Sequence, residues 1–427
     1  MKLTLKNCPV VFFMSSAILF LYYIGFVFIP IDPNVSNKII NVSGFASIFI
    51  FFIKPKEYLN SDGKIIFYAL LVLGILDLSW YAFYKSPEVV YKNAYRGYLE
   101  MGKMAVFSAF SFLILVNSRK KIKISCHLFF VFIGQLLIWA RAFYQFIYLG
   151  VPRIPLSAMS GTAGQRGAAT IAAYMITFSA IYASFVILKS NLKYKWPIFF
   201  ANFILSFSAI VMTGTRSAIF TYPLVTVLTL LINYRKEKKL LLNLLLLLGI
   251  GFVLCGFIFK NTITSRVDYL NKDLDLYYSN NSNSSVGARI AMFDVGSATA
   301  DKNFSWQSLE ERGTKIKKLV TADKQYRGAI PYLGVHMHNE TIEALSTKGI
   351  SGVIVLVLFY FSLFYYAIKS KKALLVIFPI AMMLFGISDV IMHAKPIPAS
   401  WIITLFLSSL LLSNNKESDT SAEEISR

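Results

Sequence analysis

Residues 331–352 read PYLGVHMHNETIEALSTKGISG, and a long apolar run begins near Ile350. Two of the four histidines of the chain, His336 and His338, lie in this stretch. They lie at one end of an expected membrane segment rather than inside it, where water and a substrate hydroxyl can reach them. The unperturbed pKa of histidine, about 6.5, suits a general base at neutral pH. The stretch therefore predicts a membrane helix with a chemically active segment at its N-terminal end.

The composition of the whole chain is that of a polytopic membrane protein. Of 427 residues, 56% are hydrophobic, and the mean hydropathy is +0.58, which is too apolar for a pair of soluble domains. The net charge of +21 does not indicate nucleic-acid binding, because Lys and Arg occur in short clusters between apolar runs, as orientation signals do. Cys8, Cys126 and Cys255 lack CxxC spacing and are expected to be packing residues.

The apolar runs predict an all-α polytopic fold with about twelve transmembrane helices, since a span needs about 20 predominantly apolar residues. The expected spans cover about residues 9–29, 38–53, 65–84, 102–117, 126–149, 168–188, 196–213, 217–233, 240–259, 351–368, 373–391 and 397–413. The chain then divides into nine spans within 1–259, a large loop at 260–350, three spans within 351–413 and a tail at 414–427.

Basic residues between the spans predict the orientation of the chain. If the N-terminus is cytoplasmic, five basic clusters fall on one side of the membrane, and the positive-inside rule makes that side the cytoplasm. These clusters are Lys54 with Lys56, Arg119–Lys123, Lys189–Lys195, Arg235–Lys239 and Lys369–Lys372. The tail is then cytoplasmic, and the loop at 260–350 is periplasmic.

The periplasmic loop is expected to contain three short helices. Val286–Val295 reads as a short amphipathic helix, and Ser305–Ala322 reads as a second helix with a charged face. A third is expected over Asn339–Lys348, with Gly349 at its end. Long loops usually carry function.

Two arginines are candidate phosphate ligands. Arg216 follows Thr213, Gly214 and Thr215 in a tight hairpin between two expected spans, where it either reaches water or binds an anion. Its guanidinium is a fixed fork of donors that matches phosphate oxygens. Arg289 lies in the first turn of an expected helix, where free backbone N–H groups and the helix dipole favour an anion. Taken alone, Arg289 is better read as a solvated loop arginine, as most such arginines are.

His338 opens a spaced motif. His338 and Asn339 are followed by nine residues and then by Gly349 and Gly352. This resembles the signature of the bacterial O-antigen ligases, a His followed by Asn, Ser or Gln, then a gap of nine residues and two glycines three apart. Other stretches resemble the enterobacterial members, so the resemblance covers nearly the whole chain. These stretches are Thr213–Arg216, Gly287–Ala291, and Ser388–Asp389 near Pro396–Pro398.

The resemblance implies a reaction and assigns roles. It implies transfer of a whole polysaccharide from undecaprenyl pyrophosphate to a sugar of the lipid A-core, at the periplasmic face of the inner membrane, with inversion and without metal, nucleotide or other cofactor. By resemblance, His338 is the general base, and Arg216 and Arg289 hold the pyrophosphate. The implied partners are the lipid-linked polysaccharide, the lipid A-core and membrane lipids. Without the resemblance, His338 is equally well a helix cap or a packed core residue.

Other polar residues are candidates for substrate binding. His336 either makes a supporting contact to the acceptor, beside Asn339, or has no role in the reaction. Arg153 and Arg166 are periplasmic in this orientation and would widen the anionic site.

Carboxylates within or near spans are functional candidates by default, and Asp77 and Asp389 are such groups. Asp77 either pairs with a buried Arg or Lys or caps a broken helix, and the role of Asp389 stays open. Asp273 and Asp275 form the Asp-x-Asp pair that metal-dependent glycosyltransferases use, but such pairs are common in polar turns, and this one is read as structural.

No metal site is expected. His336 and His338 would offer ligands together with Glu340 or Glu343, but a His-x-His pair lacks the i, i+4 helical spacing and no third histidine is near.

Two alternatives to a ligase are kept. An O-antigen polymerase uses another lipid-linked repeat as acceptor, and Arg153 with Gly164 resembles a spacing of that family, but the motif at His338 favours the ligase. A flippase for lipid-linked sugars would carry charges along a path through the membrane midplane, whereas here ionisable residues crowd one face.

Overall fold

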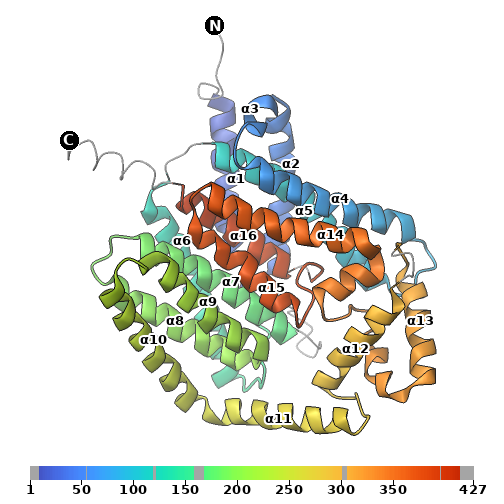
Figure 1. The fold of residues 1–427 in the computed structure, drawn as a ribbon. Helices are drawn as coiled ribbons and strands as arrows, with labels where there is room; N and C mark the ends of the chain where they lie inside the picture. The colour runs from blue at the N-terminus through green and yellow to red at the C-terminus, as the bar shows by residue number, and fades with distance from the viewer. Residues whose placement is uncertain are drawn as a thin grey trace, which may run out of the picture.

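The chain is built from helices packed side by side (Figure 1). The computed structural model describes residues 9–53, 55–118, 122–157, 168–300, 305–394 and 396–413, and no strand occurs in these ranges. The expectation of an all-α fold is therefore confirmed for the described part of the chain.

Ten helices in the described ranges are long and apolar enough to cross a membrane. They are α1 (Pro9–Phe28), α2 (Pro33–Ile53), α4 (Lys64–Tyr84), α5 (Lys92–Asn117), α6 (Ile124–Phe143), α7 (Ala168–Lys189), α8 (Lys195–Thr213), α9 (Arg216–Tyr234), α10 (Lys238–Ile258) and α14 (Glu340–Lys369). The last two expected spans are shorter apolar helices, α15 (Ile377–Gly386) and α16 (Pro396–Leu411). A short helix, α3 (Pro55–Leu59), joins α2 to α4.

Helix α7 forms the centre of the bundle. It carries no charged residue before Lys189, is apolar on all sides and is buried along nearly all of its length, as expected of a helix surrounded by others. It packs against α6, α8, α9 and α16. Helix α10 is the opposite case, because most of its leucine-rich surface is exposed, which suits contact with lipid.

The loop between α10 and α14 contains three α-helices, α11 (Lys260–Tyr278), α12 (Ser285–Thr299) and α13 (Leu309–Ala322), followed by a 3-10 helix, η3 (Lys324–Tyr332). Helices α12 and α13 lie where two helices were expected. Helix α11 was not expected, although Ile263, Val267, Leu270 and Leu274 recur at helical spacing in its sequence. None of its residues is buried. Figure 1 shows α11 running across one end of the bundle from α10 toward α12.

Gly349 divides α14 into a short helix and a membrane span. Its φ of 57° and ψ of −149° are accessible essentially only to glycine. Gly352 has a different constraint, because a Cβ there would lie 2.7 Å from the Ala344 carbonyl oxygen. The short helix therefore ends at Gly349, as expected. A side chain is disfavoured at Gly349 by its backbone angles and at Gly352 by the nearby carbonyl.

Asp77 of α4 lies against the end of the short helix. Its Oδ1 is 2.6 Å from Lys348 Nζ, and its Oδ2 is 3.3 Å from His393 Nε2. Asp77 thus pairs with a buried lysine, which was the first of the two alternatives for this residue.

Lys369, at the far end of α14, is 3.6 Å from Asp62, which lies just before α4. This contact puts the Lys369–Lys372 cluster beside the segment that follows Lys54 and Lys56. Two of the five basic clusters thus lie at one end of the bundle, and the histidines lie beyond the opposite end of α14.

Candidate functional site

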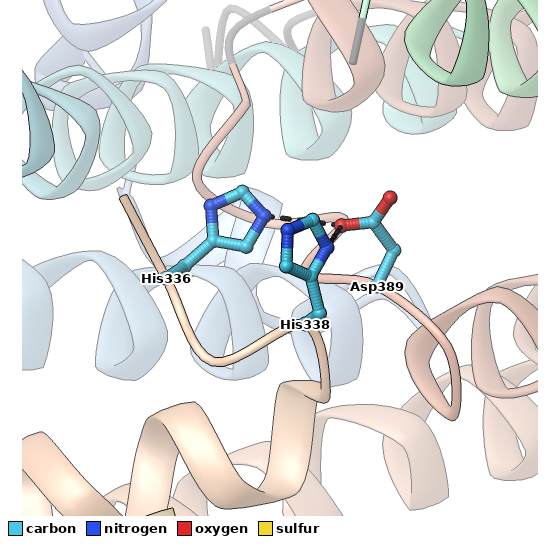
Figure 2. Close-up of side chains that lie close together, drawn as sticks. All are labelled: His336, His338 and Asp389. Atoms are coloured by element: carbon cyan, nitrogen blue, oxygen red, sulfur yellow. Dashed lines mark hydrogen bonds and ion pairs between the residues drawn. The ribbon is translucent and has the colours of Figure 1, made fainter. Parts of the chain in front are cut away.

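The centre of the site is one oxygen of Asp389. His336 Nε2 and His338 Nδ1 each lie 3.0 Å from Asp389 Oδ1, and Figure 2 shows both rings directed at that oxygen. The backbone N–H of Val390 donates to the same oxygen at 2.9 Å. Burial opposes ionisation of Asp389, but the two imidazoles outweigh it, so the pKa of this carboxyl lies well below its ordinary value.

The contact with Asp389 fixes the tautomer of His338. A carboxylate can only accept a hydrogen bond, so Nδ1 of His338 carries the proton and Nε2 keeps a free lone pair. The φ of His338 is +47°, an uncommon backbone conformation for a residue other than glycine. The ring also meets the edge of Tyr332, with a centroid distance of 5.1 Å. His338 is therefore held with Nε2 available to a substrate.

The two histidines differ in basicity. Burial lowers the pKa of His338, and the charges of His336 and Arg289 add to this, so that the attraction of Asp389 is outweighed. Burial also opposes protonation of His336, but there Asp389, Glu343 and Glu340 prevail and raise the pKa above its usual value. At neutral pH His338 favours the neutral form that a general base requires.

The loop that carries the histidines is anchored by Glu343. Its Oε2 accepts hydrogen bonds from the Met337 N–H at 2.8 Å and from Arg312 Nη1 at 2.9 Å, while Tyr98 donates to its Oε1. The side chains of Arg312 and Glu343 are each 1% exposed. A fully buried ion pair thus holds the backbone between His336 and His338.

Glu340 and Asn339 join the same loop to the segment that follows α15. Glu340 Oε2 accepts from the N–H groups of Ile391 at 2.7 Å and Met392 at 3.2 Å. Asn339 Nδ2 donates to the Ile387 carbonyl at 3.0 Å, and its Oδ1 accepts from Ile342 N–H as the cap of the short helix. These contacts bring Asp389 to the histidines.

Arg289 of α12 lies next to this centre. Its Nε donates to the Ser388 carbonyl at 3.1 Å, and its Nη1 donates to Ser285 Oγ at 2.8 Å. Ser388 immediately precedes Asp389, and Arg289 is close enough to lower the pKa of His338.

Three further arginines gather around the turn between α8 and α9. Arg153 Nε donates to the Thr213 carbonyl at 2.9 Å. Burial lowers the pKa of Arg153 to about 10, helped by the positive charges of Arg266, Arg289 and Arg216. Arg153 therefore lies within electrostatic range of all three and links the turn to the histidine centre.

The structure brings together most of the residues that the sequence singled out. His336, His338 and Asn339 share one loop, Arg289 adjoins it, and Arg153 connects Arg289 to Arg216. Arg166 lies outside the described residues.

Comparisons with known proteins show the family of this chain. The sequence model of a family described as O-Antigen ligase matches residues 201–357. The chain is 30% identical over 388 residues to the O-antigen ligase of Escherichia coli, with 90% of each chain covered. The chain belongs to the O-antigen ligase family. It is also 23% identical over 365 residues to an uncharacterised protein of Haemophilus influenzae, covering 84% of this chain and 86% of that protein.

The match to the O-antigen ligase family confirms the resemblance seen in the sequence. The matched segment contains Arg216, Arg289 and His338, whereas Arg153 precedes it and Asp389 follows it. Together with the apolar helices, membership of this family makes the chain a multi-pass membrane protein.

Sequence reasoning missed three residues of the site in this O-antigen ligase family member. Asp389 was noticed as a carboxylate near a span and within a resembling stretch, but it was given no role. Arg312 was not singled out from the charged face of its helix, and Arg266 was not considered. For Asp389 the available signal was its place in the resembling stretch Ser388–Asp389. For Arg266 the spacing of Ile263, Val267, Leu270 and Leu274 indicates a helix, but not the contact of Arg266 with Gly214.

The ligand types at the centre also bear on metal binding. The donor atoms of His336, His338 and Asp389 lie within 4.8 Å of one another, so the set could hold a metal ion. Glu340 and Glu343, the carboxylates considered from the sequence, are instead committed to backbone N–H groups and Arg312. The three N–H donors on Asp389 Oδ1 account for the arrangement as hydrogen bonds.

Proposed function

We propose that this protein transfers O-antigen polysaccharide from undecaprenyl pyrophosphate to a sugar of the lipid A-core, at the periplasmic face of the inner membrane. The observation that carries the proposal is the pairing of a neutral, oriented imidazole with a group of guanidiniums. His338 presents Nε2 to a substrate, and Arg289 binds the backbone next to the carboxylate that orients it.

His338 acts as the general base. Its Nε2 takes the proton from the acceptor hydroxyl, and the freed oxygen attacks the anomeric carbon of the donor. The bond between that carbon and the phosphate oxygen breaks, and its electron pair leaves with undecaprenyl pyrophosphate. Asp389 stabilises the imidazolium that forms, as a carboxylate does in other base–carboxylate pairs. A single displacement inverts the anomeric configuration.

The arginines receive the charge that develops on the leaving pyrophosphate. Arg289, near His338, stabilises it in the transition state, and Arg216 offers a bidentate fork to phosphate oxygens. Arg216 Nη2 lies 3.4 Å from Asp273 Oδ2, a loose ion pair that phosphate can displace. Arg153 and Arg166 extend the anionic site.

Asn339 and His336 contribute to binding on the acceptor side. An amide nitrogen carries two N–H donors, so Asn339 keeps one for a sugar hydroxyl beyond its bond to Ile387. His336 holds its proton more readily than His338 does and supplies a donor rather than a base.

The reaction is independent of metal and nucleotide in this proposal. The donor is already an activated glycosyl pyrophosphate, and arginines supply the positive charge that a metal ion supplies in other transferases. Asp389, the carboxylate nearest the histidines, is engaged by three N–H groups.

The test is transfer by the purified protein. Undecaprenyl-pyrophosphate polysaccharide is supplied with a panel of lipid A-cores, with and without a chelator, and products are resolved by gel and mass spectrometry. Polysaccharide joined to one lipid A-core, unaffected by chelator, is expected. Longer lipid-linked chains without lipid A product would indicate a polymerase, translocation without transfer would indicate a flippase, and loss with chelator would overturn metal independence.

A further inference from the structure

Arg266 of α11 packs directly on the turn between α8 and α9. Gly214 forms this turn with a φ of +63°, and a Cβ at Gly214 would lie 2.7 Å from Arg266 Nη2 and 2.8 Å from its Nε. The Arg266 guanidinium thus occupies the space that any side chain at position 214 would need. Its other neighbour is the ring of Tyr269, with Cζ 5.9 Å from the ring centroid. Contacts with Gly214 and the Tyr269 ring therefore position the Arg266 guanidinium at this turn. Arg216 lies two positions after Gly214 in the chain.

The donors of this pair of arginines are not used up. Nε of Arg266 and Nη1 of Arg216 are buried and have no hydrogen-bond partner among the residues that the structure describes. Burial lowers the pKa of Arg266, and the neighbouring charge of Arg216 lowers it further. Asp273 is the carboxylate that approaches the pair, and it lies 3.4 Å from Arg216 Nη2. The buried donors of Arg266 and Arg216, together with their positive charge, favour binding of an anion at this place.

We propose that Arg266 binds the prenyl-linked phosphate of the donor, while Arg289 binds the sugar-linked phosphate. This rests on the proposed function. Arg289 contacts the backbone beside Asp389 and so lies where the bond to the sugar breaks. Helix α11 begins at Lys260, just after α10 ends at Ile258, and Arg266 lies about 9 Å along it at 1.5 Å per residue. Arg266 is therefore close to the membrane surface, where the phosphate attached to the prenyl chain must lie.

Each arginine then has a different part in the reaction. The bond that breaks joins the anomeric carbon to an oxygen of the sugar-linked phosphate, so charge develops first beside Arg289. The prenyl-linked phosphate carries its charge before and after the reaction. Arg266 is thus expected to act mainly on donor binding, and its loss should raise the KM for donor more than it lowers kcat.

The experiment measures binding of farnesyl pyrophosphate and farnesyl monophosphate to the purified, detergent-solubilised protein. The unaltered protein is expected to prefer the pyrophosphate. Arg266→Gln should reduce affinity for both compounds by about tenfold or more, the usual effect of losing a charge-assisted hydrogen bond, because both carry the prenyl-linked phosphate. It should keep the preference for the pyrophosphate, whose second phosphate meets Arg289. Arg266→Lys should retain part of the affinity, because the charge stays and the fork is lost.

Lys272→Gln is the matched control. Lys272 is exposed on the same helix, so this variant removes one positive charge without touching the turn at Gly214. Because no residue of α11 is buried, both variants are expected to stay folded, and thermal unfolding in detergent checks that they do.

The outcomes separate this inference from the proposed function. If Arg266→Gln binds both compounds as tightly as the unaltered protein does, Arg266 is not a phosphate ligand, and the proposed transfer stands. A loss of affinity confined to the pyrophosphate would place Arg266 at the sugar-linked phosphate and overturn the assignment. If Lys272→Gln lost the same affinity, the effect of Arg266→Gln would come from the net charge of the protein and not from a contact with phosphate. That result would also overturn the inference. If the unaltered protein neither prefers prenyl pyrophosphate nor transfers polysaccharide, the proposed function itself fails.

Discussion

Asp389 Oδ1 lies 3.0 Å from Nδ1 of His338, and this contact leaves Nε2 as the ring nitrogen that meets a substrate. The orientation depends on a carboxylate that also receives His336 and the Val390 N–H. The base precedes α14 and its orienting group follows α15, so the packing of these helices in the bundle is what assembles the site.

Asp389→Asn is expected to lower kcat for transfer by about tenfold to a hundredfold. The variant keeps the size of the side chain, but it loses the charge that stabilises the imidazolium, which is one part of the roughly 10² to 10⁴ that a general base contributes. His338→Ala should cost the whole of that contribution, while donor lipid still binds. Steady-state kinetics of both variants test this, and an Asn variant with unchanged kcat would remove Asp389 from the reaction.

The acid side of the pH–rate profile is expected to report His338. A general base works when unprotonated, so activity should be present above the pKa of His338 and should fall as the pH drops through it. Since the pKa of His338 is lowered by burial and by neighbouring positive charge, this fall should occur below about pH 6.5.

His336→Gln should move that fall to higher pH. The variant removes a positive neighbour that lowers the pKa of His338. It also leaves His338 as the one imidazole that contacts Asp389, and both changes raise the pKa of His338. The measurement is kcat/KM against pH for the two proteins. A fall that stays in place or moves to lower pH would show that His336 does not act on the base.

Much of this centre could be predicted from the sequence, because it is local. His338, Asn339, Gly349 and Gly352 lie in one motif, and the need for glycine at both later positions is a property of the backbone nearby. Asp389 could not be assigned in the same way. It is 51 positions from His338, and only the packing of the segment after α15 on the histidine loop brings them together.

The arginines show the same limit. Arg216 and Arg289 drew attention through their local settings, a tight hairpin and a helix start. Arg266 has no such local setting. It lies on a mostly polar helix, and its place in the site depends on a contact with Gly214, far away in the chain. The shorter α15 and α16 differ from the expected full spans for a related reason, because apolar composition does not fix where a helix ends.

Arg216→Lys should lose most of the transfer activity although the charge is kept, because an ammonium cannot present the bidentate fork. We expect a decrease of kcat/KM for the donor of about tenfold or more. Asp273→Asn is the matched opposite, since it frees Arg216 from a competing carboxylate 3.4 Å away and should lower the KM for donor. Near-normal transfer by a correctly inserted Lys variant would rule out the fork, and an unchanged KM in the Asn variant would show that Asp273 does not compete.

Glu343→Gln is expected to destabilise the protein far more than loss of an exposed ion pair. Glu343 and Arg312 are each 1% exposed and 2.9 Å apart, so the neutral variant leaves the Arg312 charge buried without a partner, at a cost of about 3–5 kcal/mol. Glu311→Gln is the comparison, because it breaks the pair with Lys315 on the exposed face of α13, the helix that carries Arg312. Such i, i+4 pairs contribute about 0.3–0.5 kcal/mol. Denaturant unfolding of both variants in detergent gives the comparison.

Because Glu343 also accepts from the Met337 N–H between the two histidines, the Gln variant should lose the ordered position of His338. It should therefore lose transfer activity at temperatures where the bundle is still folded. Equal stability of the two variants would mean that water reaches Arg312, and the histidine loop would then need another anchor.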